Sequence, residues 1–327
     1  MPEGAVDDAT VHRMPSPRPR PFRFTVQASR LPHPDALVPL ARKAEDLGVA
    51  VLTVADHLDD QLAPIAAMMA VADATTDLRI GSLVFANDYR HPVVLAKEAA
   101  TIDVLSGGRL EFGLGAGWMA HDYRSAGIPM DRPGVRIERL EEALQVVLAL
   151  WADGPVEHDG RHYQVHGLEG QPKPLQQPRP PVVIGGGGPR VLALAGRYAD
   201  IIGLNPALAA GVIDEHAGPS ATAEATEQKL LVIREAAGER FERIELQTRI
   251  HLAIVTDDRQ AMFELFAEGF GLTPDQARHS PHALCGTVDQ ISDDLLERRE
   301  RFGISTIGLS ASALDDMAPV IARLAGA

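Results

Sequence analysis

The chain has 327 residues, of which 45% are hydrophobic, and its formal net charge is −14. This length is enough for one large domain with a full core, and α/β barrels of this size are usually single domains. The acidic balance argues against nucleic acid or an anionic membrane surface as a partner, because phosphate groups attract basic faces, and it leaves small molecules and proteins. The single cysteine, Cys285, excludes an intramolecular disulfide and fits a reducing cytoplasm.

Residues 1–21, MPEGAVDDATVHRMPSPRPRP, are polar and rich in proline and arginine. They lack the apolar region that a signal peptide requires, so we expect a disordered leader followed by a single domain over 22–327. No uncharged apolar run approaches the roughly 20 residues that a membrane span needs. The sequence therefore predicts a cytoplasmic protein without a membrane partner.

From residue 22 the chain alternates short β-rich runs with longer segments of helical apolar spacing, which is typical of a parallel sheet with crossover helices. The predicted strands are 23–29, 49–55, 78–86, 109–115, 181–185, 199–204, 244–255 and 304–310. The predicted helices are 34–47, 62–75, 91–105, 134–151, 189–197, 220–237, 258–268, 287–301 and 314–325. Eight such units predict an α/β fold of the (β/α)₈ TIM barrel type, with a doubly wound open sheet as the alternative.

Two predicted helices have clear local signals. Segment 134–151 has one apolar stripe, which is formed by Ile137, Leu140, Leu144, Val147, Leu148 and Trp151. Segment 287–301 opens with Thr287 and Gln290 at the spacing of a capping box, in which each side chain accepts a hydrogen bond from the other residue's backbone. Both signals predict structure and carry no chemistry.

Two connections are longer than an ordinary loop of this fold. One follows the fourth strand, at 116–133, and the other joins the fourth helix to the fifth strand, at 152–180. The sequence therefore predicts a barrel with insertions at these two places. Because the second one combines prolines and glycines with His162, Tyr163 and His166, we expect it to form part of a lid over the substrate.

In a TIM barrel the chemistry lies at the C-terminal ends of the strands. The fourth strand runs into GGRLEFGLGAGW, which places Gly113, Gly115 and Gly117 in G-x-G-x-G spacing. A dinucleotide fingerprint needs its last glycine three residues further on, inside a helix, so a Rossmann site is not predicted.

The fifth strand ends in VVIGGGGPR, with four glycines at 185–188 before Pro189 and Arg190. Several backbone donors at a helix N-terminus make an anion cradle, and the simpler alternative is a flexible turn that needs glycine. The second strand ends in Asp56 and His57. Such a histidine is either a hydrogen-bonded structural residue or a proton donor.

Metal binding is not predicted. His158, His162 and His166 have no completing carboxylate or cysteine pair, and the group formed by His279, His282 and Cys285 has no evident fourth ligand.

Three stretches together carry a family resemblance: HPVVLAKEAATIDVLSGGRLEFGLGAGW, PGVRIERLEEALQVVLALW and PPVVIGGGGPRVLALAGRYADIIGL. They resemble the luciferase-like monooxygenase superfamily, especially its branch of oxidoreductases that use coenzyme F420. The resemblance covers nearly all of residues 22–325. It implies an eight-stranded barrel, usually a homodimer, with a flavin or deazaflavin ring at the C-terminal mouth.

The resemblance also implies roles for particular residues. The glycines of the fourth strand let the ring approach the backbone, the glycine run holds the cofactor phosphate, and His57 lies near the ring as the catalytic residue. Relatives have a non-prolyl cis peptide behind the ring, which falls here between Leu83 and Val84. The implied cofactor-binding residues are Asp56, Leu83, Val84, Ala86, Asn87, Gly113, Gly115, Gly117, Trp118, Gly185, Gly186, Gly187, Gly188 and Arg190.

F420 is the cofactor that the resemblance favours, with FMN as the alternative. Only F420 carries an oligoglutamate tail, for which basic residues at the rim are available, namely Arg124, Arg132, Arg136 and Arg190. Trp118 stands where some F420 enzymes have an acidic residue, which argues against a sugar-phosphate dehydrogenase mechanism.

The leading function is hydride transfer between F420 and a small organic substrate. An FMN-dependent monooxygenase that uses O₂ and a non-catalytic cofactor-binding protein are the alternatives.

Overall fold

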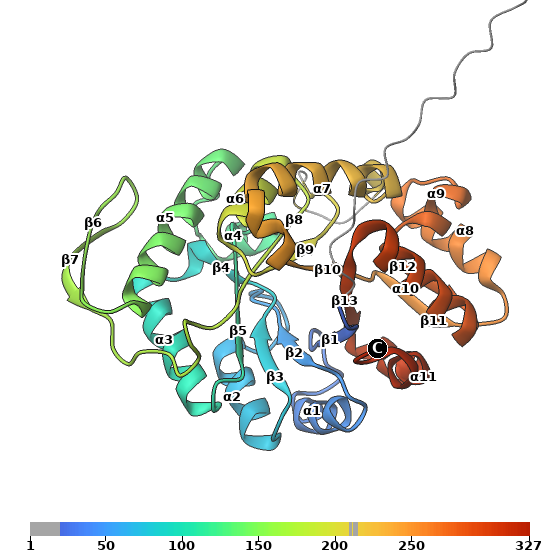
Figure 1. Cartoon of the computed structure of the whole chain (residues 1–327), viewed down its shortest axis with the longest axis horizontal. Coiled ribbons are helices and arrows are strands. Elements are labelled where there is room, and N and C mark those ends of the chain that lie inside the picture. The colour runs from blue at the N-terminus through green and yellow to red at the C-terminus, as the bar shows by residue number, and fades with distance from the viewer. Residues whose placement is uncertain (1–19, 209–210, 212–214) are drawn as a thin grey trace, which may run out of the picture.

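Eight parallel strands close into a barrel (Figure 1). The computed structural model describes residues 20–208, 211 and 215–327, so residues 1–19 of the expected leader lie outside the described chain. The barrel strands are β1 (Arg23–Gln27), β2 (Val51–Val54), β3 (Arg79–Ser82), β5 (Leu110–Gly115), β8 (Val182–Gly186), β9 (Ile201–Leu204), β10 (Glu245–Arg249) and β13 (Ile304–Ser310). Pairing of β1 with β13 and of β3 with β5 closes the ring. The predicted TIM barrel is confirmed, and the open sheet is wrong.

One long helix separates each barrel strand from the next, and the helices cover the outside of the barrel (Figure 1). These helices are α1 (Leu37–Asp46), α2 (Pro64–Ala74), α3 (Pro92–Leu105), α5 (Pro133–Trp151), α6 (Pro189–Tyr198), α7 (Ala223–Ala237), α10 (Val288–Phe302) and α11 (Leu314–Leu324). Leu140, Leu144 and Val147 of the predicted apolar stripe are fully buried. None of the described helices is both long enough and apolar enough to cross a membrane.

Three excursions interrupt this pattern. Helix α4 (Ala120–Ala126) follows β5, and the hairpin of β6 (Pro155–Asp159) and β7 (Gln164–Glu169) lies between α5 and β8. The third excursion follows β10 and contains β11 (Leu252–Val255), α8 (Arg259–Phe270), α9 (Pro274–His279) and β12 (Ala283–Gly286). Short turns of 3-10 helix occur at Pro34–Ala36, Asn87–Tyr89, Glu215–Ser220, Gly238–Arg243 and Ala311–Ala313.

The prediction of one strand over 244–255 is wrong. The amide of Ile250 still donates to Gly308 of the barrel, whereas the next amide, of His251, donates to His282. The chain therefore changes its partner between β10 and β11, and β11 pairs with β12 outside the barrel. Consequently α8 belongs to the excursion, and α10 is the seventh barrel helix.

The predicted lid over the substrate stays a prediction: the Tyr163 hydroxyl of this segment accepts from Asn87 Nδ2 at 3.1 Å, but most of the segment packs elsewhere on the barrel. The hairpin lies along α5, where the Glu142 carboxylate accepts hydrogen bonds from the His162 amide at 2.7 Å and from His158 Nε2 at 3.2 Å. Further along, Gln176 Nε2 donates to the carbonyl of Leu110, the first residue of β5, at 2.8 Å. These contacts place most of the segment against the side and the N-terminal end of the barrel.

An ion-pair network closes the N-terminal end of the barrel. Arg23 at the start of β1 pairs with Glu245 of β10 at 2.6 Å and with Glu111 of β5. Arg79 of β3 reaches the same Glu111 carboxylate at 3.0 Å. Ligand access is therefore expected at the opposite end, where the strands finish.

The predicted capping box of α10 is confirmed: the amide of Gln290 donates to Thr287 Oγ1 at 3.3 Å, and the amide of Thr287 donates to Gln290 Oε1 at 3.0 Å. Replacing Thr287 with alanine should lower the free energy of unfolding by about 1 kcal/mol, measured by urea denaturation. Thr101→Ala is the control, because that hydroxyl bonds to Lys97 O inside α3 and caps nothing. Equal stability of the two variants would contradict this account of the cap.

Candidate active site

Strand alternation determines which side chains face the barrel interior. Gln247 of β10 donates to Thr25 Oγ1 of β1 across the interior at 3.4 Å, so both residues point inward. Two residues further along the same strands, Arg249 and Gln27 face the same way at the C-terminal mouth. Between them Gly308 carries no side chain, and a Cβ there would lie 3.4 Å from Thr25 Oγ1. Gly308 therefore leaves room for the Gln247 and Thr25 side chains in the layer below the mouth.

The third strand bends at the mouth. The Leu83–Val84 peptide bond is cis, as the family resemblance implied, and the strand resumes as β4 (Phe85–Ala86), which pairs with the end of β5. Gln27 Nε2 donates to the Leu83 carbonyl at 3.2 Å, and the amide of Ala86 donates to Asp56 Oδ2 at 2.9 Å. Polar side chains from two neighbouring strands thus hold the bend on both sides.

The glycines of the fourth strand make room for this bend. A Cβ at Gly113 would lie 2.0 Å from the Ser82 carbonyl oxygen, and one at Gly115 would lie 2.6 Å from a methyl group of Val84. Gly117 has φ +73°, and a Cβ there would lie 1.8 Å from the Tyr123 hydroxyl. A Cβ on any of these glycines would meet the chain itself, so the glycines make room for Ser82, Val84 and Tyr123. Their contact with a cofactor ring stays a prediction.

His57 is held by an acid that the sequence analysis missed. Its Nδ1 lies 2.8 Å from Asp122 Oδ2, and the Asp122 side chain is 1% exposed against 18% for His57. The Tyr89 hydroxyl donates to the same oxygen at 3.3 Å, and burial together with this carboxylate raises the pKa of Tyr89. Trp118 presents its ring perpendicular to the imidazole, with 5.6 Å between centroids. Asp122 lies on α4, which follows the glycine strand.

The Asp56 carboxylate binds a second group besides the Ala86 amide, namely the guanidinium of Arg90. Its two oxygens accept from Arg90 at 2.5 and 3.1 Å, a bidentate pair that keeps the carboxylate buried. Asn87 is also buried and donates to the Tyr163 hydroxyl at 3.1 Å, while its Oδ1 has no partner in the described chain. An amide oxygen that is buried and unpaired suits a donor supplied by a ligand.

The four consecutive glycines differ in their surroundings. A Cβ at Gly186 would lie 2.3 Å from Val191, and one at Gly187 would lie 2.4 Å from Pro206. Gly188 is the N-cap of α6 with φ −89°, and a Cβ there would meet nothing within 4 Å. Gly188 is therefore the member of the run that opens onto solvent at a helix N-terminus, where the dipole favours anions.

The arginines expected at the rim also differ. Arg190 is exposed and lies 3.7 Å from Glu138, so it stays available to an anionic group. Arg136 is buried and donates to the carbonyls of Ala116 and Gly117, which fixes the loop after β5. The prediction of Arg136 as a rim residue is therefore wrong, because its charge faces inward to the backbone.

A basic cluster on the β10 side of the mouth was not predicted. Arg249, His251 and His282 each have a buried nitrogen without a hydrogen-bond partner among the described residues, namely Nη1, Nε2 and Nε2. Burial lowers the pKa of Arg249 to about 10 and that of His251 to about 4, so the guanidinium carries the charge near neutral pH. The sequence does contain a pattern that could have indicated Arg249: Glu245, Gln247 and Arg249 are polar residues at every second position of one strand, so they share one face.

Comparison with known proteins agrees with this geometry. Residues 18–302 match the sequence profile of the family described as luciferase-like monooxygenase. The chain is 29% identical to an F420-dependent glucose-6-phosphate dehydrogenase of Gordonia bronchialis, over 80% of this chain and 77% of that protein. Its match to the enzyme of that name from Amycolatopsis mediterranei, 33% identical, covers 51% of this chain and spans only 52% of the relative.

Flavin enzymes are also among the relatives. The oxygenase component of the flavin-dependent trigonelline monooxygenase of Acinetobacter baylyi is 30% identical over 45% of this chain and 42% of that protein. A solved F420-dependent secondary alcohol dehydrogenase in complex with an F420-acetone adduct superposes with a TM-score of 0.73 at 21% identity, covering 93% of this chain and 99% of that one. This structure supports the fold alone.

The contrast within the glycine run yields a prediction. Gly188→Ala should weaken binding of the phosphate-bearing cofactor at least tenfold, because a methyl group enters the space in front of the backbone donors, and should leave the melting temperature nearly unchanged. Gly187→Ala should lower the melting temperature, because its Cβ collides with backbone. Cofactor titration and thermal unfolding check both. A Gly188→Ala variant that binds F420 and FMN as tightly as wild type would place the phosphate elsewhere.

Proposed function

Because the chain belongs to the luciferase-like monooxygenase family and is an oxidoreductase, we propose that it transfers a hydride between coenzyme F420 and a small organic substrate at the C-terminal mouth of the barrel. The observation that carries this proposal is the pairing of His57 with Asp122 beside the bend at Leu83 and Val84. F420-dependent relatives support the choice of cofactor.

The mouth has the features that such a cofactor needs. Gly188 offers an open helix N-terminus for a phosphate, and Arg190 lies two residues beyond it for further negative charge. Asn87 Oδ1 is a buried acceptor without a partner among the described residues. F420, when bound, supplies or accepts the hydride. The glycine run, Arg190 and Asn87 would hold it, and the bend at Val84 would lie against it.

His57 would handle the proton that accompanies the hydride. The buried Asp122 carboxylate accepts from Nδ1, which fixes this tautomer and the ring orientation and leaves Nε2 for the substrate. Neutral Nε2 accepts a proton from an alcohol that is being oxidised, and protonated His57 returns one to a carbonyl or alkene that is being reduced. Trp118, packed edge-on against the imidazole, limits its movement.

An FMN-dependent monooxygenase is the alternative, and the flavin-dependent relatives support it. Two assays separate the candidates. Under anaerobic conditions, the F420 proposal expects oxidation of reduced F420 by a panel of carbonyl, imine and alkene acceptors, or reduction of F420 by alcohols. The alternative expects substrate-dependent O₂ uptake with reduced FMN and no exchange with F420. A homodimer stays a prediction from the family resemblance, and a cytoplasmic location stays a prediction from the sequence composition.

Replacing His57 with asparagine should lower kcat at least a hundredfold, because general acid–base groups contribute about 10² to 10⁴ in rate. Asp122→Asn should also lower kcat, because the amide cannot hold Nδ1–H in the same way. Both variants should keep the F420 dissociation constant within about threefold, since neither removes an atom assigned to the phosphate or the tail. Loss of cofactor binding in both variants, with kcat of the loaded enzyme unchanged, would show that the pair serves binding and not proton transfer.

We also propose that the substrate carries an anionic group that pairs with Arg249. This guanidinium lies at the mouth end of its strand, and its Nη1 is buried without a partner in the described chain. Burial lowers the pKa of the neighbouring His251 to about 4, so that imidazole adds no positive charge near neutral pH. A buried unpaired charge is costly, and a carboxylate or phosphate on the substrate would offset that cost. The relatives named for glucose 6-phosphate, a substrate with such a group, support this class.

The test compares the substrate found in the acceptor panel with its uncharged ester or amide. Wild type should prefer the anion, and Arg249→Gln should lower kcat/KM for the anion about tenfold or more through KM, consistent with a hydrogen bond to a charged group. The same substitution should change kcat/KM for the neutral analogue little. An unchanged preference in the variant would remove Arg249 from substrate recognition.

A further inference from the structure

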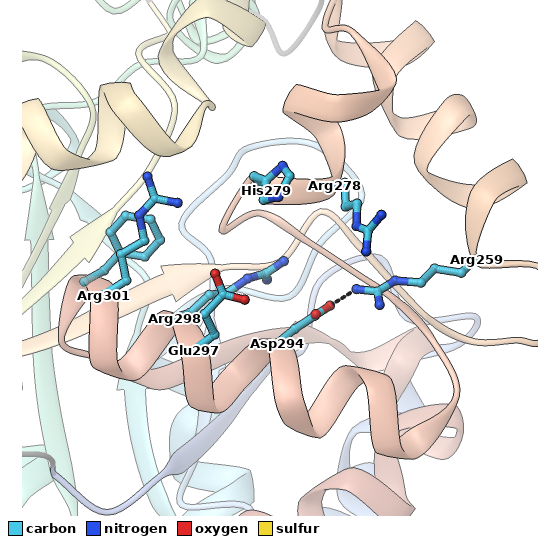
Figure 2. A pocket seen from close by; sticks show the side chains of 8 residues that line it. Arg259, Arg278, His279, Asp294, Glu297, Arg298 and Arg301 are labelled. Atoms are coloured by element: carbon cyan, nitrogen blue, oxygen red, sulfur yellow. Dashed lines mark hydrogen bonds and ion pairs between the residues drawn. The ribbon is translucent and has the colours of Figure 1, made fainter. Parts of the chain in front are cut away.

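A second basic pocket lies away from the mouth, in the outer layer formed by the third excursion and α10 (Figure 2). Arginines from three helices line it: Arg259 of α8, Arg278 of α9, and Arg298 and Arg301 of α10. The family resemblance assigned nothing to this region, and none of these residues faces the barrel interior.

The charges in this pocket do not balance. Arg259 is paired with Asp294, and Arg301 is paired with Glu227 at 2.7 Å. Arg278 has no hydrogen bond or ion pair among the described residues. Arg298 donates only to the carbonyl of Ala283, at 2.7 Å.

Two arginines of the pocket thus lack a carboxylate partner. The acid of the lining without an ion pair among the described residues is Glu297, which is exposed and whose carboxylate lies beside Arg298 in the close-up (Figure 2). The pocket therefore keeps positive charge after its own ion pairs are counted.

Arg298 is the least accessible of these cations. The residue is 6% exposed, and its Nη1 is buried without a hydrogen-bond partner in the described chain. Arg259 Nε in the same lining is also buried and unpaired. Burial lowers the pKa of Arg298 to about 10, so the group is still a cation near neutral pH. An unpaired guanidinium costs free energy unless an anion completes its hydrogen bonds.

We propose that this pocket binds a phosphate group, bridging Arg278 and Arg298. Guanidinium groups from separate helices suit a tetrahedral oxyanion, which accepts several hydrogen bonds at once. The cavity of about 90 Å³ has room for a group of this size. The ligand is inorganic phosphate or the phosphate of a small ester whose remainder stays in solvent.

The pocket is connected to the mouth through one short strand. Arg298 holds the carbonyl of Ala283, the first residue of β12, and the preceding residue, His282, has its Nδ1 3.0 Å from the carbonyl of Arg249. Two contacts, from Arg298 to Ala283 and from His282 to Arg249, therefore link the ligand-binding arginine to the basic cluster at the mouth.

Calorimetric titration of the full-length protein with inorganic phosphate, at ionic strength fixed with chloride, tests the proposal. Wild type should show saturable binding, and Arg278→Gln should weaken it about tenfold or more. Because Arg278 is exposed and has no partner among the described residues, this variant should fold as wild type does. Glu297→Gln should strengthen binding, since it removes the opposing charge. Tighter binding of glycerol 3-phosphate than of phosphate would identify an ester as the ligand, and the reverse order would identify the free anion.

Arg243→Gln is the matched control, because Arg243 is an exposed arginine outside the pocket. It should bind phosphate as wild type does. The proposal is overturned if wild type shows no saturable binding, if Arg278→Gln binds as tightly as wild type, or if Arg243→Gln loses as much affinity as Arg278→Gln. Binding at the mouth alone would give the second of these results.

Discussion

The close packing of Val84 against the fourth strand is the constraint on which the mouth of the barrel depends. Val84 occupies the space beside Gly113 and Gly115, where no Cβ fits, and its strand can bend inward only because both positions are glycine. Asp56 then holds the resumed strand through the amide of Ala86, and the residue after Asp56 is His57. One steric requirement thus sets the shape of the third strand and the position of the candidate proton-transfer residue.

The two sides of the mouth carry opposite charges, a buried carboxylate on one side and a guanidinium on the other. On the side of β2 and α4, the buried Asp122 carboxylate faces His57 and Tyr89, which favours proton transfer with a fixed imidazole. On the side of β10, Arg249 lies among imidazoles, and burial lowers the pKa of His251 to about 4. A substrate with an anionic group would therefore be oriented across the mouth, with its reacting carbon towards His57.

Much of the fold could be predicted from the sequence, because each barrel strand is a short β-rich run followed by a longer segment of helical character, and segment 134–151 has a clear apolar stripe. The split of 244–255 could not, since the run has no glycine or proline between its two halves and only a change of hydrogen-bond partner at His251 separates them. The path of segment 152–180 was also out of reach, because composition indicates an excursion but not which part of the barrel it packs on, and Gln176 places its second half at the N-terminal end.

Only part of the candidate site could be predicted from the sequence. His57 and the glycines stood out by position and spacing, whereas Asp122 lies 65 residues from His57 on a helix that was expected to be a loop. The reason for Gly113 and Gly115 was also out of reach, because the partner that requires them is Val84 on another strand. Arg249 could be placed only once the Gln247 contact with Thr25 showed which face of β10 points into the barrel.

The central claim is that a deazaflavin binds at the mouth beside His57 and Trp118. The chain has 2 tryptophans, Trp118 at the mouth and Trp151 buried on α5, so a Trp151→Phe variant reports on Trp118 alone. Titrating this variant should give saturable quenching of the remaining tryptophan fluorescence with F420, and weaker binding with FMN. Saturable quenching by FMN without any by F420 would contradict the assignment of the cofactor, and absence of quenching by both would contradict the site itself.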